Sequence, residues 1–103
     1  MVQGEVIGFA QFIMGENGRG ELTRIYVLPE WQRRGVGSGL LREGLAALST
    51  QGAGEVFVQV EKGNARAIAF YERSGFHQVR EFSLELPGQN LELLEYALSL
   101  GAR

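Results

Sequence analysis

A short segment of the chain combines two arginines with closely spaced glycines, a pattern that suits the binding of phosphate. It reads Gln32-Arg33-Arg34-Gly35-Val36-Gly37-Ser38-Gly39 and leads into a stretch with leucines at helical spacing. At the start of a helix the first backbone N–H groups lack intrahelical partners, and the positive end of the helix dipole lies beside them. Glycines let an anion approach those N–H groups, and the arginines add cationic donors. The segment therefore predicts a pyrophosphate site at a helix N-terminus.

Two other phosphate-binding motifs do not fit these residues. A Walker motif needs a lysine in the loop, but the only lysine of the chain is Lys62. A Rossmann fingerprint needs a third glycine where Leu40 stands, and a glycine turn directly after the strand rather than well beyond Val27. A Rossmann-type nucleotide domain is therefore the weakest of the alternatives.

The composition limits the remaining chemistry. With 103 residues, of which 45 % are hydrophobic, the chain can bury one modest core, so we expect a single domain over residues 1–103. A net charge of −2 argues against nucleic-acid binding. The absence of cysteine and the presence of one histidine, His77, argue against a metal site. Neither a signal peptide nor an apolar stretch of the roughly 20 residues needed to cross a membrane is evident, so we expect a cytoplasmic protein.

Seven segments have patterns typical of strands or helices. Apolar and β-branched residues alternate or cluster where strands are expected, and leucines at helical spacing predict the first helix. Asn64 suits the start of the second helix and Gly75 its end. Pro87-Gly88 favours a turn, so the last segment is predicted as a strand, although its leucines also suit a helix. The expected order is strand 6–14, strand 21–28, helix 37–50, strand 56–60, helix between 64 and 75, strand 76–86 and strand 91–100.

The first two predicted strands are antiparallel, and the second and third are parallel because a strand–helix–strand crossover joins them. The predicted fold class is therefore α/β (α+β), with a mixed, mostly antiparallel sheet and two helices. Simple alternation along the second strand divides its side chains between two faces. It places Leu22, Arg24 and Tyr26 on one face and Thr23, Ile25 and Val27 on the other.

The first predicted strand is too apolar to be left in water on a chain of this size. Unpaired strand edges also invite pairing with another chain. We therefore expect a homodimer in which a second copy covers this strand and its apolar residues, Val6, Ile7, Phe9, Phe12 and Ile13.

Two motifs, in the same order along the chain, resemble those of the GNAT superfamily of N-acetyltransferases. The glycine-rich segment is similar to the family's Gln/Arg-x-x-Gly-x-Gly/Ala signature, and it lies between Tyr26-Val27-Leu28-Pro29 and Gly39-Leu40-Leu41. Residues 64–76 resemble the family's Asn-x-x-Ala-x-x-Phe-Tyr-x-x-x-Gly-Phe segment. The resemblance implies a GNAT-like sheet whose parallel strands splay around coenzyme A. GNAT domains ordinarily begin with a further strand and two helices, so we expect this N-terminal part of the fold to be missing.

The resemblance also implies an activity and a cosubstrate. It implies transfer of an acetyl group from acetyl-coenzyme A to a primary amine, of a small molecule or of a protein, by direct attack and without a metal. The backbone of residues 25–27 would line the pantetheine arm, and the glycine-rich loop would hold the pyrophosphate. The implied cofactor-binding residues are Ile25, Tyr26, Val27, Gln32, Arg33, Arg34, Gly35, Val36, Gly37, Ser38, Gly39, Asn64, Arg66, Tyr71 and Arg73.

Four of the candidate side chains have more than one interpretation. Tyr71 matches the tyrosine that protonates the departing thiolate, and its ordinary pKa of about 10 suits a proton donor; the alternative is a packed core tyrosine. Glu21 is the candidate general base, with an exposed strand-end carboxylate or a water relay as alternatives. Asn64 is a plain helix cap or also touches the pantetheine arm. Arg66 and Arg73 are solvated, or one of them reaches the 3′-phosphate of the coenzyme.

A different class of function is also open. The absence of the usual N-terminal elements, which form much of the acceptor wall in the family, would suit a non-catalytic acetyl-coenzyme A-binding or assembly module. Turnover of a primary amine separates an enzyme from such a module.

Overall fold

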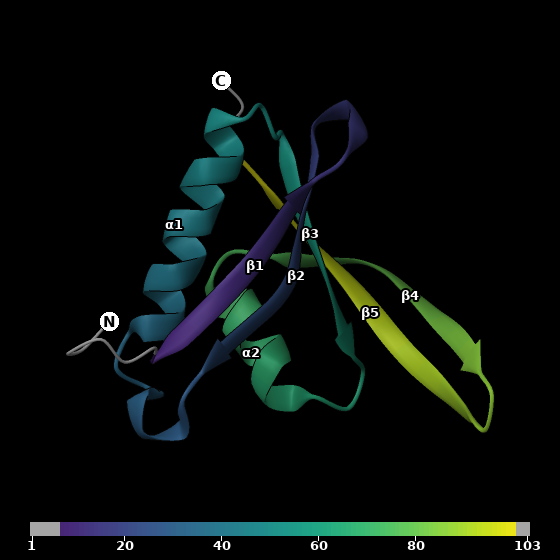
Figure 1. Ribbon diagram of the computed structural model, residues 1–103. Coiled ribbons are helices and arrows are strands. Elements are labelled where there is room, and N and C mark those ends of the chain that lie inside the picture. Colours follow the sequence, from purple (N-terminus) through teal and green to yellow (C-terminus); the bar gives the residue numbers. More distant parts are fainter. Residues whose placement is uncertain (1–6, 101–103) are drawn as a thin grey trace.

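The computed structural model describes residues 7–100 (Figure 1). Every predicted element is present, and the ambiguous last segment is a strand. The predicted strand residue Val6 lies outside the described residues. The order is β1 (Gly8–Met14), a 3-10 turn (Glu16–Gly18), β2 (Arg19–Val27), a 3-10 turn (Pro29–Trp31), α1 (Val36–Thr50), β3 (Glu55–Glu61), α2 (Ala65–Arg73), β4 (His77–Leu86) and β5 (Gln89–Ser99).

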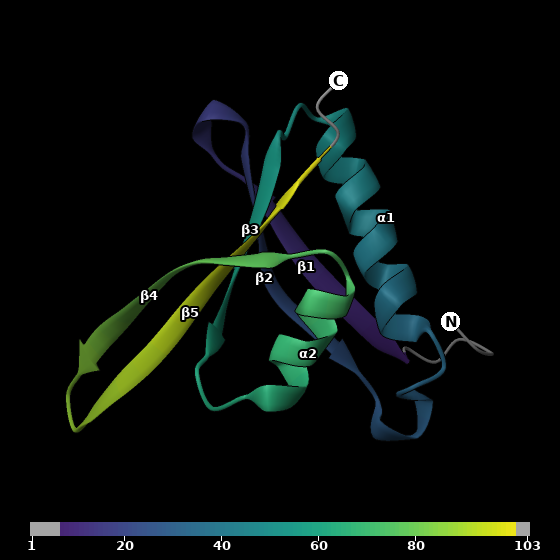
Figure 2. The same ribbon diagram turned by 180° about the vertical axis from the view of Figure 1, so that it is seen from behind.

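The five strands form one sheet in the order β1-β2-β3-β5-β4, in which only β2 and β3 are parallel. This arrangement confirms the predicted fold class. The Pro87-Gly88 turn joins β4 and β5 into a long hairpin that projects from the rest of the sheet in Figures 1 and 2. Neither α1 nor α2 is long and apolar enough to cross a membrane, and these are the α-helices of the described chain.

Both helices pack against one face of the sheet. The alternating Val56, Val58 and Val60 of β3 are buried in one cluster with Leu41 of α1 and Tyr71 of α2. Figure 2 shows the molecule from the side on which the helices cover the sheet. The intervening β3 residues therefore point to the other face, which no helix of residues 7–100 covers.

The parallel pair separates soon after it forms. Only three residue pairs join β2 to β3, and the last is Glu21 with Phe57. Beyond it the two strands diverge (Figure 1), so the β2 backbone from Thr23 to Val27 has no β3 partner. This is the splay that the family resemblance implies, and it opens the sheet between the two helices.

A bulge between β1 and β2 overturns the predicted faces of β2. Gln11 pairs with Arg24 while the next residue, Phe12, pairs with Leu22, so Thr23 is an extra residue in the ladder. As a result Leu22 is buried and Ile25 packs against the same core. Simple alternation had placed these two side chains on opposite faces. Alternation fails here because it assumes an unbroken ladder, and a bulge shifts the side-chain phase by one residue.

Phe12 corrects another expectation, since it does not contribute to an exposed apolar surface. Its ring occupies the space that a side chain at Gly44 of α1 would need. This glycine lets α1 approach β1 closely. Phe9 and Ile13, in contrast, are exposed on the helix-free face.

Candidate functional site

The glycine-rich segment forms a tight loop at the start of α1. Arg33 and Gly35 both adopt left-handed backbone conformations, with φ of 64° and 81°. The first intrahelical hydrogen bond of this turn runs from the Gly39 N–H to the Gly35 carbonyl, at 3.0 Å. The N–H groups of residues 36–38 precede it and therefore need an acceptor from outside the helix. The Gln32 side chain fixes the loop to the end of β2 by donating to the Val27 carbonyl, at 3.0 Å.

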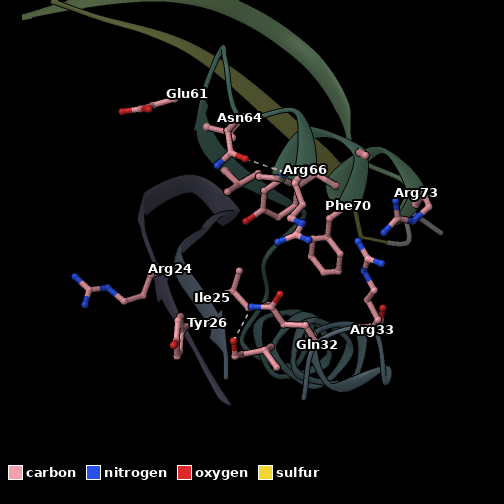
Figure 3. Close-up of a pocket in the computed structure, with 18 of the residues that line it drawn as sticks. Arg24, Ile25, Tyr26, Gln32, Arg33, Glu61, Asn64, Arg66, Phe70 and Arg73 are labelled. Atoms are coloured by element: carbon pink, nitrogen blue, oxygen red, sulfur yellow. Dashed lines mark hydrogen bonds between the residues drawn. The ribbon is translucent and has the colours of Figure 1, made fainter. Parts of the chain in front are cut away.

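A cavity of ≈ 910 Å³ lies between this loop, the diverging strands and α2 (Figure 3). It includes most of the residues predicted to bind the cofactor. These are Ile25, Tyr26, Val27, Gln32, Arg33, Gly35, Gly37, Ser38, Asn64, Arg66, Tyr71 and Arg73.

Three predicted residues lie outside the lining of this cavity: Arg34, Val36 and Gly39. The Arg34 guanidinium stacks over Trp31, 5.0 Å from the ring centroid. The β3 residues 58–61 and Phe70 also line the cavity, although they were not predicted as site residues. Alternation identified β3 as a strand, but only the short register of the parallel pair reveals that its second half faces a gap.

The part of the cavity near the loop is cationic. Figure 3 shows Arg33, Arg66 and Arg73 near Phe70, at the end that the loop and α2 form, whereas Glu61 lies at the other end. All three arginines are exposed, so their donors are accessible to a bound group. Together with the N–H groups at the start of α1, they suit a ligand carrying several phosphates.

Tyr71 is buried where α2 meets the cavity. Its ring makes edge contacts with Phe70 and Phe76, with centroids 5.3 and 5.6 Å apart. Burial raises the pKa of the Tyr71 hydroxyl above its ordinary value. The hydroxyl is therefore protonated at neutral pH, as a proton donor must be.

Asn64 caps α2 as predicted. Its side-chain oxygen accepts a hydrogen bond from the Ala67 N–H, at 3.1 Å. Asn64 also lines the cavity, so its side chain is fixed in place at the edge of the site.

Glu21 lies on the opposite side of the sheet from the helices, at the last residue pair before β2 and β3 diverge. It lines a second cavity of ≈ 320 Å³ together with Phe57, Gln59 and Glu95. The two cavities share the lining residues Thr23, Val58 and Gln59, so they meet at the gap between the strands.

Residues 1–76 match the model of the acetyltransferase (GNAT) family. The chain belongs to this family. Over 73 residues it is 34 % identical to an uncharacterised N-acetyltransferase of Mycobacterium tuberculosis, a match that covers 71 % of the chain and 47 % of the relative. It is 40 % identical over 73 residues to the mycothiol acetyltransferase of Clavibacter michiganensis, a match that covers 71 % of the chain and 24 % of that relative.

The solved structure of the ribosomal-protein-S18-alanine N-acetyltransferase of Escherichia coli has the same fold. Its TM-score is 0.82 at 26 % identity, and the match covers 100 % of the chain and 67 % of that structure. The present chain spans half or less of the length of the curated GNAT relatives described above.

GNAT acetyltransferases use acetyl-coenzyme A as their cosubstrate. The donor set on the helix-covered face fits this molecule, because free N–H groups and arginines lie at one end of a long cavity and an unpaired strand edge lies beside it. Within residues 7–100, no three His, Cys, Asp or Glu side chains are grouped so that they could hold a metal ion.

Proposed function

We propose that this chain carries the acetyl-coenzyme A site of an N-acetyltransferase that acts on a primary amine. The observation that carries the proposal is the cavity between the diverging β2 and β3, which ends at the free N–H groups of α1 and three arginines. Such an arrangement suits a long ligand with a phosphate-rich end and a neutral arm.

The coenzyme would lie along this cavity with its pyrophosphate at the loop. The N–H groups of Val36, Gly37 and Ser38 would bind phosphate oxygens, and the Arg33 side chain would add charge-assisted hydrogen bonds. Arg66 and Arg73 lie on the exposed side of α2, within reach of a further phosphate. Gly39 would act through the shape of the loop, and Arg34 through its contact with Trp31.

The pantetheine arm would pair with the free edge of β2. The backbone of Ile25 to Val27 has no β3 partner, so its polar groups are available to an amide-containing ligand. One N–H group of this edge would polarise the thioester carbonyl and stabilise the oxyanion of the tetrahedral intermediate. Asn64, at the other side of the gap, would contact the same arm.

The acceptor would arrive through the smaller cavity. Its amine nitrogen attacks the thioester carbon, a C–N bond forms, and collapse of the intermediate breaks the C–S bond. Glu21 would take the proton that the amine loses, and the Tyr71 hydroxyl would give a proton to the departing thiolate. The acceptor is a primary amine of a small molecule or of a protein. Side chains on the helix-free face would determine the specificity for this acceptor.

A homodimer remains part of the proposal. Phe9 and Tyr26 form an exposed aromatic pair, with ring centroids 6.0 Å apart, and Ile13 is exposed on the same face. A second copy would cover these side chains and lie beside the acceptor cavity. Sedimentation equilibrium tests this proposal, and a stable monomer of 11.3 kDa at micromolar concentration would exclude the dimer.

The activity is tested by incubating the protein with acetyl-coenzyme A and a panel of amines and following the release of free thiol. Turnover of one amine supports the enzyme. Binding of coenzyme A without turnover of any amine would instead indicate a non-catalytic module. A thermal shift with coenzyme A, but none with NAD, separates both from a dinucleotide-binding domain.

A further inference from the structure

A buried carboxylate on the helix-free face of the sheet is held by two arginines from different strands. Only 5 % of the Glu95 side chain, on β5, is exposed. Its Oε2 accepts a hydrogen bond from an Nη of Arg19 on β2, at 2.8 Å, and its Oε1 accepts one from Nε of Arg80 on β4, at 3.0 Å. Glu95 therefore joins three strands of the sheet through its two oxygens.

Arg19 connects this carboxylate to the predicted base. Its guanidinium carbon lies 3.6 Å from the centroid of the Phe57 ring, and its Nε lies 3.2 Å from Oε2 of Glu21. The same guanidinium thus contacts Glu95, Phe57 and Glu21. A planar group that Glu95 and Phe57 fix on two sides holds its third partner, Glu21, in one geometry.

Glu21 and Glu95 both line the smaller cavity, which meets the coenzyme cavity at the gap between β2 and β3. Glu21 is the less constrained of the two, since 38 % of its side chain is exposed and Arg19 is the partner that holds it within the described chain. Without Glu95, Arg19 would lose the contact that orients it toward the middle of the sheet. The Glu21 carboxylate would then follow Arg19 into other rotamers.

We propose that Glu95 is a positioning residue for the acceptor side, which acts through Arg19 to hold the Glu21 carboxylate at the gap where the amine arrives. This inference rests on the proposed function, because it assigns Glu95 to the reaction that Glu21 serves. It explains why the charged Glu95 side chain is buried, between two residues of β5, Leu94 and Tyr96, that belong to the core.

The charge of Glu95 is consistent with this role. Burial raises the pKa of its carboxyl group, but hydrogen bonds with Arg80, Gln59 and Arg19 together lower it below its ordinary value. Charged residues on the same face of the neighbouring strands include Arg19 and Glu21 on β2, Glu55 and Glu61 on β3, and Arg80 on β4.

Kinetics of single and double variants test the inference. With the best amine of the panel, Glu21→Gln should lower kcat/KM by about a hundredfold or more, as expected for loss of a general base. Glu95→Gln should lower it by about tenfold, and the double variant should be no slower than Glu21→Gln alone. The KM for acetyl-coenzyme A should be unchanged in all three.

Two further variants serve as matched tests. Glu92 lies on the same strand, and within the described chain its carboxylate accepts hydrogen bonds only from the exposed Ser83, so Glu92→Gln should leave kcat/KM unchanged. Arg19→Lys keeps the positive charge on a half-exposed side chain but loses the planar group, so it should reproduce the loss in Glu95→Gln without affecting the fold. The inference would be overturned if the double variant lost kcat/KM by the product of the two single losses. A wild-type kcat/KM in Glu95→Gln would overturn it as well. Either result would show that Glu95 only stabilises the sheet.

A measurement without an acceptor keeps the inference testable if no amine is acetylated. In the free protein, the Arg19 Nε–H should give a slowly exchanging NMR signal because it is bonded to Glu21 and the group is stacked on Phe57. This signal should be lost in Glu95→Gln and kept in Glu92→Gln. Its retention in folded Glu95→Gln would contradict the inference whatever the activity, whereas a lack of turnover with the signal lost would contradict the proposed function alone.

Discussion

The two faces of the sheet carry two different kinds of site. On the helix-covered face the cavity is formed by the free edge of β2, the glycine-rich loop, the second half of β3 and one side of α2, all within residues 23–73. On the helix-free face the smaller cavity depends on Arg19, Phe57, Glu95 and Arg80, which come from four strands spread over the chain. Backbone groups dominate the first site and a side-chain network dominates the second.

This difference has a chemical reason. A pyrophosphate and an amide-containing arm are invariable ligands, and backbone N–H groups bind them without depending on particular side chains. An acceptor amine varies between enzymes, so its site is formed by side chains. Changes on the helix-covered face should therefore alter coenzyme binding or proton transfer to the thiolate, and changes on the other face should alter use of the acceptor.

The largest effect is expected at Tyr71. Tyr71→Phe removes the proposed proton donor and should lower kcat by about a hundredfold or more, while the affinity for coenzyme A is retained. Steady-state kinetics and calorimetry measure the two quantities.

Tyr96→Phe is the matched control for this change. Tyr96 is also buried, but its hydroxyl donates to Glu72 at 2.9 Å and does not line the cavity. This variant should lose about 1 kcal/mol of stability with little change in kcat. If both variants kept wild-type turnover, Tyr71 would be a core residue and water would supply the proton.

The next effect is expected at Gly37. A Cβ atom there would lie 3.7 Å from the Phe70 ring, an ordinary contact, so Gly37→Val should fold. Its side chain would nevertheless occupy the pyrophosphate position, and the Kd for coenzyme A should rise by about a hundredfold, or about 2.7 kcal/mol.

Gly54→Val is the control for Gly37→Val, because a Cβ at Gly54 would meet open space. It lies far along the chain from the loop and should leave the Kd unchanged. Equal affinities in wild-type protein and Gly37→Val would remove the assignment of the phosphate loop.

A smaller effect is expected from the arginines of α2. Arg66→Gln or Arg73→Gln should weaken binding of coenzyme A by about tenfold, the effect of one charge-assisted contact of about 1.4 kcal/mol. The same variant should bind dephospho-coenzyme A, which lacks the 3′-phosphate, as well as the wild-type protein does. A loss of affinity that is equal for both ligands would place the arginine elsewhere on the coenzyme.

The smallest effect concerns acid stability on the helix-free face. The pKa of Glu95 is lower in the folded protein than in the unfolded chain, so its contribution to stability is present above the unfolded pKa of about 4.3 and is lost as the pH falls through the folded pKa. Because solvent screens the half-exposed guanidinium groups of Arg19 and Arg80, this contribution is about 1 kcal/mol. Urea unfolding between pH 7 and pH 3 should show a shallower loss of stability in Glu95→Gln than in wild-type protein. Equal losses of stability with falling pH in the two proteins would contradict this prediction.

The same contrast explains what could be predicted from the sequence. The glycine-rich loop and the Asn64 to Phe76 segment are contiguous motifs, so most residues of the larger cavity and the order of the elements could be predicted from local patterns. The faces of β2 were predicted wrongly because one extra residue, Thr23, shifts the phase of the strand. The Arg19–Glu95–Arg80 network has no local pattern, since its members meet only through the pairing of β2 with β3, β3 with β5 and β5 with β4.

Titration calorimetry of acetyl-coenzyme A into the wild-type chain and into Gly37→Val tests the central claim most directly. We predict one saturable site in the wild-type protein, with a Kd below about 100 μM, and affinity about a hundredfold weaker in the folded variant. The absence of saturable binding to the wild-type chain up to about 1 mM would contradict the account, as would equal affinity in the two proteins.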